Sequence, residues 1–179
     1  MESYELTIAG VKRELPIIAI DDHLKIASFV ILGDTELIAA AAPVLAKKLP
    51  EVDILFTAEA KGIPLVYELS KQLHMKQYIV ARKSVKPYMD HPLIHKVVSI
   101  TTQKEQVLCL DANDAAMLKG KKVALIDDVI STGESMKGLE ELAAAAGAKV
   151  VAKAALLAEG DAEKRSDIIY LEKLPVFKE

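Results

Sequence analysis

The sequence contains little cysteine and few aromatic residues. Its single cysteine, Cys109, excludes an internal disulfide framework and a zinc site built from several cysteines, which is typical of proteins from a reducing compartment. Aromatic residues make up 4% of the chain, against 51% for hydrophobic residues as a whole, so the core must be built from Val, Ile, Leu and Ala. That composition favours an α/β fold.

Membrane-spanning and secretory segments are also missing. The longest apolar stretch, residues 37–46, contains Pro43 and is far shorter than the roughly 18 residues that a membrane span requires. The first residues, MESYELTIAGVKRELP, lack the basic start and apolar centre of a secretory signal. A net charge of -3 argues against electrostatic binding to nucleic acid or anionic lipid as the main task of the surface. We therefore expect a soluble, cytoplasmic protein that binds neither nucleic acid nor membrane.

Several catalytic motifs are absent as well. The chain has neither the G-x-x-x-x-G-K-[ST] loop of P-loop NTPases nor the G-x-G-x-x-G dinucleotide fingerprint. Ser135 lies in GESMK, which misses the nucleophile elbow of hydrolases by one glycine. His91 and His95 have helical spacing, but the segment between them holds a proline and lacks the glutamate of a zinc protease. We expect both histidines to be non-catalytic loop residues and Cys109 to be a small core residue.

Apolar periodicity predicts strands that alternate with helices. The first core helix is expected to begin at Asp34 or Thr35, to end at about Lys48, and to be kinked or shortened by Pro43. The other predicted elements are strands at 53–57, 77–81, 123–126, 149–158 and 167–171, helices at 62–73, 111–120 and 136–146, a long loop at 82–96, and a hairpin of 97–102 with 106–110. This alternation implies βαβ crossovers. We therefore predict an α/β fold with a mainly parallel twisted sheet flanked by helices, formed by residues 1–179 as a single domain.

The carboxyl ends of three predicted strands lead into polar connections. Ligands of such sheets bind beyond these ends, where the sequence has TAEAKG at 57–62, ARKSVK at 81–86 and DDVISTGES at 127–135. In the last, a Ser-Thr-Gly loop runs into a helix, so free N–H groups and the positive end of the helix dipole can receive a phosphate. Asp127 and Asp128 are expected at the wet end of their strand, where they can bind sugar hydroxyls or orient a Mg²⁺-bound water.

The other two connections carry positive charge. Lys61 and Gly62 can meet a second anionic group, and Arg82, Lys83 and Lys86 form a basic cluster. Taken alone, each of these basic patterns is more often part of a solvated surface. An Asp-Asp pair is also too common to indicate a site by itself. Their convergence on one crevice favours a site for a sugar phosphate.

The stretch VALIDDVISTGES resembles the ribose-phosphate signature of type I phosphoribosyltransferases, which use 5-phosphoribosyl-1-pyrophosphate. The resemblance extends from about Asp34 over most of the chain and implies the fold of that family, with about residues 1–33 forming much of a small hood over the base. It implies that Asp127 and Asp128 hold the ribose hydroxyls at the catalytic centre. The residues implied in 5-phosphate binding are Ser131, Thr132, Gly133, Glu134 and Ser135.

The resemblance also implies the pyrophosphate and base sites. The pyrophosphate loop is matched by Glu59, Ala60, Lys61 and Gly62, where a non-proline cis peptide often lies in the family. RKSVK is similar to the R-K-x-x-K of adenine phosphoribosyltransferases, which makes Arg82, Lys83 and Lys86 pyrophosphate ligands, with a homodimer as the expected assembly. Phe29 and Val30 then belong to the hood that covers the base.

The identity of the base stays open. RKSVK points to adenine, but the stretches LKIASFVILGD and SITTQKEQ are similar to xanthine phosphoribosyltransferases. Adenine enzymes carry a glutamate on the catalytic loop, and the matching position in this sequence is Thr101 or Thr102. Glu105 lies nearby in the sequence but does not match that position. Xanthine enzymes are expected to have an amide side chain in the hood and a lysine near the C-terminus. This sequence has Ile31 and Gly160 at those positions.

The resemblance implies a Mg²⁺-dependent enzyme that transfers the phosphoribosyl group to a purine base, with adenine as the first candidate. The sequence does not assign any residue as a direct ligand of the metal. The alternatives are xanthine or hypoxanthine/guanine as the base, a non-purine acceptor, or a regulator that binds the sugar pyrophosphate without turnover. The missing glutamate favours the regulator. The short segment before the first core helix and the acidic surface argue against a DNA-binding form of it.

Overall fold

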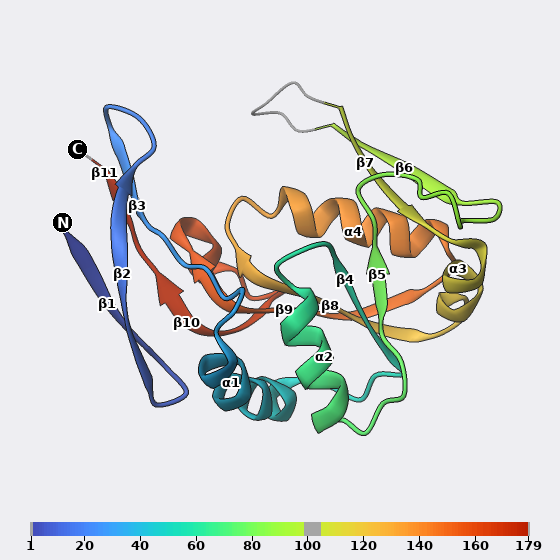
Figure 1. Cartoon of the computed structure of the whole chain (residues 1–179), viewed down its shortest axis with the longest axis horizontal. Coiled ribbons are helices and arrows are strands. Elements are labelled where there is room, and N and C mark those ends of the chain that lie inside the picture. The colour runs from blue at the N-terminus through green and yellow to red at the C-terminus, as the bar shows by residue number, and fades with distance from the viewer. Residues whose placement is uncertain (1, 99–104, 179) are drawn as a thin grey trace.

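The computed structural model describes residues 2–98 and 105–178. At its centre is a five-stranded sheet, covered on one face by α1 (Thr35–Lys48) and α2 (Ile63–Gln72) and on the other by α4 (Glu134–Ala145) (Figure 1). No helix in the described part of the chain is both long and apolar enough to cross a membrane.

All strands of the central sheet run parallel, which confirms the predicted architecture. The sheet has the order β10-β9-β8-β4-β5. Its strands are β4 (Ile54–Ala58), β5 (Ile79–Ala81), β8 (Lys122–Ile130), β9 (Lys149–Glu159) and β10 (Ile169–Leu174). Because successive side chains of a strand point to opposite faces, Leu55 and Ile126 pack under α1 and α2, whereas Phe56 and Leu125 pack under α4.

The first core helix runs through Pro43 and is not shortened by it, contrary to one expectation. The Asp34 carboxylate caps α1 by accepting the Leu37 N–H at 3.1 Å. Ala41 and Leu45, on either side of the proline, are fully buried. Packing of this face against the core therefore compensates for the hydrogen bond that the proline cannot donate.

The segment predicted as a long loop is partly a strand. β6 (Leu93–Val98) pairs antiparallel with β7 (Glu105–Leu110), so His95 lies in a strand and not in a loop. Its Nε2 is 2.6 Å from Glu141 Oε2 of α4, and this contact helps to hold the hairpin against the helix. The hairpin was predicted, but residues 99–102 of its first strand lie outside the described residues. The helical turn predicted at 111–120 is α3 (Ala112–Leu118).

A second, antiparallel sheet forms the hood, with the order β1-β2-β3-β11. Its strands are β1 (Ser3–Ile8), β2 (Val11–Ala19), β3 (Leu24–Ala27) and β11 (Val176–Lys178). The N-terminal residues were expected to supply much of the hood, but the sequence did not predict that a C-terminal strand completes it. Both ends of the chain consequently lie on the same side of the molecule (Figure 1). Arg13 Nε and Nη2 tie this sheet to α1 by donating to the Asp34 carboxylate at 2.8 and 3.0 Å.

Candidate functional site

Three connections meet at the carboxyl edge of the central sheet because the strands that precede them are neighbours. β8, β4 and β5 are adjacent in the sheet order, and they are followed by residues 131–133, 59–62 and 82–92 respectively (Figure 1). The sheet order therefore brings together the three segments that the sequence assigned to one crevice.

The two acids lie within β8 and not beyond its end, which corrects the predicted strand boundary. β8 pairs with β9 as far as Ile130, whereas its pairing with β4 ends at Leu125. The ladder to β9 thus keeps the backbone extended through Asp127 and Asp128, while the side of β8 that faces β4 is left unpaired. The backbone of β8 beyond Leu125 is therefore not covered by a strand on this side.

The acid pair is more shielded from water than a wet strand end would be. Asp128 is 6% exposed, Asp127 is partly buried, and the Asp128 N–H donates to Asp127 Oδ1 at 2.8 Å. Burial, followed by the neighbouring Asp128 carboxyl, raises the pKa of Asp127 well above its usual range. Asp127 therefore retains its proton more readily than an ordinary carboxyl group, and a nearby cation favours its ionised form.

A buried threonine joins β4 to β8 where their backbone pairing stops. Thr57 Oγ1 donates to the Ile126 carbonyl at 2.7 Å, and a side chain on Gly62 would collide with that hydroxyl. The φ of Gly62 is -74°, an ordinary helical value, so the close approach of the loop to the sheet is what requires glycine here. Sequence reasoning missed Thr57, although a threonine at the end of an apolar strand was a visible signal.

The Ser-Thr-Gly loop leaves the start of α4 open. Gly133 directly precedes the helix, its φ of 84° lies in the left-handed region that glycine tolerates, and no side chain in the described ranges caps the helix well. Thr132 Oγ1 accepts the Glu134 N–H only at 3.4 Å, and Ser131, Thr132 and Ser135 are exposed. A helix start of this kind, without a strong side-chain cap, is a common place for an anion to bind.

Glu59 links the connections that follow β4 and β5. Its Oε1 accepts the Lys83 N–H at 2.6 Å, and its Oε2 accepts from Arg82 Nε at 3.2 Å. The Lys83 N–H and the Arg82 guanidinium lower the pKa of Glu59, so the link is ionic at neutral pH. The Glu59–Ala60 peptide bond is cis, as the resemblance implied. Lys61 is exposed and forms no ion pair in the described part of the chain.

The first residue of the basic connection is fixed by β7. Arg82 and Cys109 exchange backbone hydrogen bonds of 2.9 and 2.8 Å, and the Cys109 side chain is fully buried, as predicted. Arg82 Nη1 donates to the Tyr88 hydroxyl at 2.6 Å, while Lys86 Nζ donates to Ser84 Oγ at 2.7 Å. Both cations are held by neighbouring side chains of their own connection.

Lys83 differs from these two cations because its side chain is exposed. Its charge offsets part of the rise in the pKa of Asp127, which places positive charge from the β5 connection near the acid pair of β8. Lys83 is therefore the cation of RKSVK that bears most directly on the acids.

The two residues predicted to cover the base lie between β3 and α1. Phe29 is 8% exposed and belongs to the apolar core, whereas Val30 is 55% exposed. Only Val30 presents its side chain to solvent. Ile31 is fully buried, and Gly160 begins the 3₁₀ helix η1 (Gly160–Lys164).

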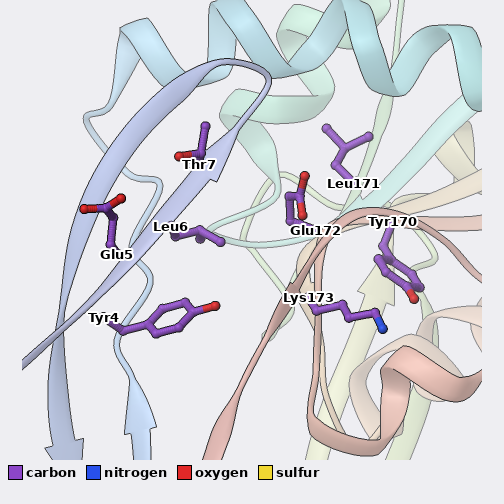
Figure 2. A pocket seen from close by; sticks show the side chains of 8 residues that line it. All are labelled: Tyr4, Glu5, Leu6, Thr7, Tyr170, Leu171, Glu172 and Lys173. Carbon is purple, nitrogen blue, oxygen red and sulfur yellow. The ribbon is translucent and has the colours of Figure 1, made fainter.

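A cavity of about 460 Å³ lies away from this crevice. It lies between β1, an edge strand of the hood sheet, and β10, an edge strand of the central sheet. Its lining consists of residues 4–7 and 170–173, with Tyr4, Glu172 and Lys173 among them (Figure 2). None of these residues belongs to the three connections, so the cavity is not part of the candidate site.

Metal-binding side chains do not cluster in the described part of the chain. Within residues 2–98 and 105–178, no group of three or more His, Cys, Asp and Glu side chains is placed to hold a metal ion. Thr101 and Thr102, the positions expected for a proton acceptor, lie outside the described residues. Glu105 begins β7 and pairs with Lys96 at 3.0 Å.

Comparison with known proteins gives a consistent family. Residues 32–175 match the model of the phosphoribosyl transferase domain. The adenine phosphoribosyltransferase of Thermosipho africanus is 32% identical over 71% of this chain and 72% of that protein. The xanthine phosphoribosyltransferase of Chloroflexus aurantiacus is 31% identical over 80% of this chain and 66% of that protein. A hypoxanthine/guanine phosphoribosyltransferase of Methanocaldococcus is 33% identical over 64% of this chain, which spans only 54% of that relative.

Solved structures show the same fold. The adenine phosphoribosyltransferase of Thermoanaerobacter pseudethanolicus has a TM-score of 0.66 at 23% identity and covers 80% of this chain and 84% of its own. A purine phosphoribosyltransferase of Pyrococcus horikoshii has a TM-score of 0.55 at 22% identity, covering 76% of this chain and 82% of its own. The resemblance carried by VALIDDVISTGES is thus confirmed, and the chain belongs to the phosphoribosyl transferase family of enzymes.

Proposed function

We propose that this chain transfers the phosphoribosyl group of 5-phosphoribosyl-1-pyrophosphate to a purine base, adenine first, and releases pyrophosphate. One observation carries the proposal: an open helix N-terminus, a shielded acid pair and two cation-bearing connections share one edge of the sheet in a member of this family. Each of the three features suits a different part of the sugar pyrophosphate.

In the proposed complex, the 5-phosphate binds the N–H groups at the start of α4, and the ribose hydroxyls donate to Asp127 and Asp128. The pyrophosphate lies near Lys61, Arg82 and Lys83. The base nitrogen forms a bond to C1 as the C1–O bond breaks, and the electron pair of that bond leaves with the pyrophosphate. The base loses its N–H proton to a proton acceptor as the new bond forms. Positive charge placed around the departing pyrophosphate lowers the barrier because it stabilises charge that develops during the reaction.

Mg²⁺ fits this site as an ion that the substrate carries. It prefers oxygen ligands, keeps several waters, and is commonly bound by one or two carboxylates together with substrate phosphates. Asp127 and Asp128 are carboxylates that could serve in this way, and a neighbouring cation would lower the raised pKa of Asp127. When bound, the ion neutralises charge on the pyrophosphate.

Adenine stands first because RKSVK matches the pattern of adenine enzymes, and relatives named for xanthine and for hypoxanthine/guanine supply the alternatives. We further propose a cytoplasmic homodimer of single-domain chains, and light scattering of the purified protein measures the assembly directly.

The test offers adenine, hypoxanthine, guanine and xanthine in parallel to the purified protein with 5-phosphoribosyl-1-pyrophosphate and Mg²⁺, and follows pyrophosphate release. Asp127→Asn/Asp128→Asn should abolish release. Asp21→Asn/Asp22→Asn, an adjacent acid pair in the β2–β3 turn, is the matched control and should retain it.

Release with one base, lost only in the first double variant, would support the reaction and identify the substrate. Tight binding of the sugar pyrophosphate without turnover of any base would refute the enzyme hypothesis and favour a regulator that senses the sugar pyrophosphate. Absence of binding would refute both.

A further inference from the structure

Arg165 lies against the phosphate loop, and the proposed function has not used it. It follows η1, which continues from the carboxyl end of β9, the strand beside β8. A Cβ built on Gly133 would lie 2.7 Å from Arg165 Nη1, so the guanidinium touches the loop at its glycine. A fourth connection therefore joins the three that the sequence assigned to the site.

The guanidinium has a fixed orientation. Arg165 Nε and Nη2 donate to the two carboxylate oxygens of Asp167 at 2.9 and 2.7 Å. Asp167 also accepts from Lys153 Nζ at 3.2 Å, and Lys153, whose side chain is 18% exposed, reaches Glu140 of α4 at 3.4 Å. This chain of charges connects Arg165 to β9 and α4, so the arginine is not a loose surface cation.

The remaining nitrogen, Nη1, faces the loop without an acceptor in the described part of the chain. A cation beside a helix N-terminus is unfavourable by itself, because the aligned peptide dipoles place positive partial charge there. An anion bound at the same helix end makes the arrangement favourable, because the anion is attracted both by the helix N-terminus and by the Arg165 guanidinium.

The geometry keeps such an anion close to Arg165. The Gly133 nitrogen lies about 2.5 Å from the position of its own Cβ, and an N–H···O bond spans about 2.9 Å. With the 2.7 Å between that Cβ position and Nη1, an anion oxygen bound to the Gly133 N–H lies within about 8 Å of Nη1. That separation is no greater than the screening length of physiological salt.

We propose that Arg165 is a binding residue for the 5-phosphate of the substrate, where its free Nη1 adds positive charge to the N–H groups of residues 131–135. Asp167 and Lys153 act as positioning residues for it. The proposal rests on the proposed function, and its test is designed so that the two can fail separately.

Isothermal titration calorimetry with two probes tests it. Ribose 5-phosphate would occupy the start of α4, whereas Mg²⁺-pyrophosphate would occupy the connections that carry Lys61 and Lys83. Arg165→Gln should weaken ribose 5-phosphate binding about tenfold and leave pyrophosphate binding unchanged. Arg13→Gln is the matched control, because Arg13 also holds a carboxylate through Nε and Nη2, but in the hood.

A pH series separates charge from architecture. The second pKa of a phosphate monoester is about 6, so the difference between the wild type and Arg165→Gln should shrink as the pH falls below that value and the probe loses charge. Unchanged ribose 5-phosphate binding in Arg165→Gln, or an equal loss of both probes, overturns the role of Arg165. If the wild-type protein binds neither probe, the proposed function fails, and this inference with it.

Discussion

Replacing Gly62 with alanine perturbs the close contact between the start of α2 and the end of β4. The added methyl group would overlap the hydroxyl of Thr57, which is 1% exposed and donates to the Ile126 carbonyl at 2.7 Å. Either α2 moves off the sheet, or Thr57 rotates and leaves that carbonyl unpaired. Overpacking and an unpaired buried polar group each cost about 1–3 kcal/mol, so we expect the free energy of unfolding to fall by about 2–3 kcal/mol.

Removing the obstructing hydroxyl should relieve the strain. Thr57→Ala alone loses one buried hydrogen bond, a cost of about 1–2 kcal/mol. In the double variant the nearest remaining atom is the Cβ of residue 57, 3.3 Å from the new methyl group, which a small shift accommodates. The double variant should therefore be about as stable as Thr57→Ala, with a coupling energy equal to the cost of Gly62→Ala alone, about 2–3 kcal/mol.

Urea unfolding followed by far-ultraviolet circular dichroism measures these free energies, because the chain has no tryptophan to report on unfolding. All variants are compared at one protein concentration. Ser70→Ala is the matched control, since Ser70 is also a buried hydroxyl, bonded at 2.7 Å to the Tyr67 carbonyl within α2. Gly62→Ala should be additive with Ser70→Ala. Additivity with Thr57→Ala as well would refute the proposed collision.

Three further predictions concern charged groups. Because the pKa of Asp127 is raised, the unfolded chain releases this proton at lower pH than the folded protein, and stability falls as pH rises above about 4. Asp127→Asn should therefore be more stable than the wild type, by a margin larger at pH 8 than at pH 5 in urea unfolding; a margin that does not depend on pH would contradict the raised pKa. His95→Ala should free the β6–β7 hairpin from Glu141 and speed hydrogen exchange of its amides, while the amides of the central sheet should not change. Asp34→Ala should lower the free energy of unfolding by about 1–2 kcal/mol because the Leu37 N–H loses its cap, and Asp34→Asn, which can still cap, should lose clearly less.

The order of elements could be predicted because each βα unit carries its own local signals. The cap at Asp34 and the positive φ of Gly147 after α4 mark helix ends that the sequence placed to within about two residues. The motif after β8 could be recognised for the same reason, since strand, acids, loop and helix are contiguous in the chain.

Features that depend on distant partners could not be predicted in this way. The acids were placed beyond their strand because the sequence does not show that β9 pairs with β8 as far as Ile130. Leu93 was assigned to a loop because the alternation of β6 is a half-exposed pattern that only its pairing with β7 supports. Arg165 was not selected because it lies far along the chain from Gly133, and a single surface arginine carries no pattern.

The site owes its shape to the unequal partners of one strand. β9 holds β8 in register to Ile130, whereas β4 leaves it after Leu125, and the Thr57 hydroxyl satisfies the first unpaired carbonyl. Beyond that point β8 remains paired with β9 but not with β4, and Asp127 and Asp128 lie in this singly paired part of the strand. Burial makes the ionised form of Asp127 unfavourable in the unliganded protein, so a ligand that supplies hydroxyl donors or a cation at this residue should stabilise the fold.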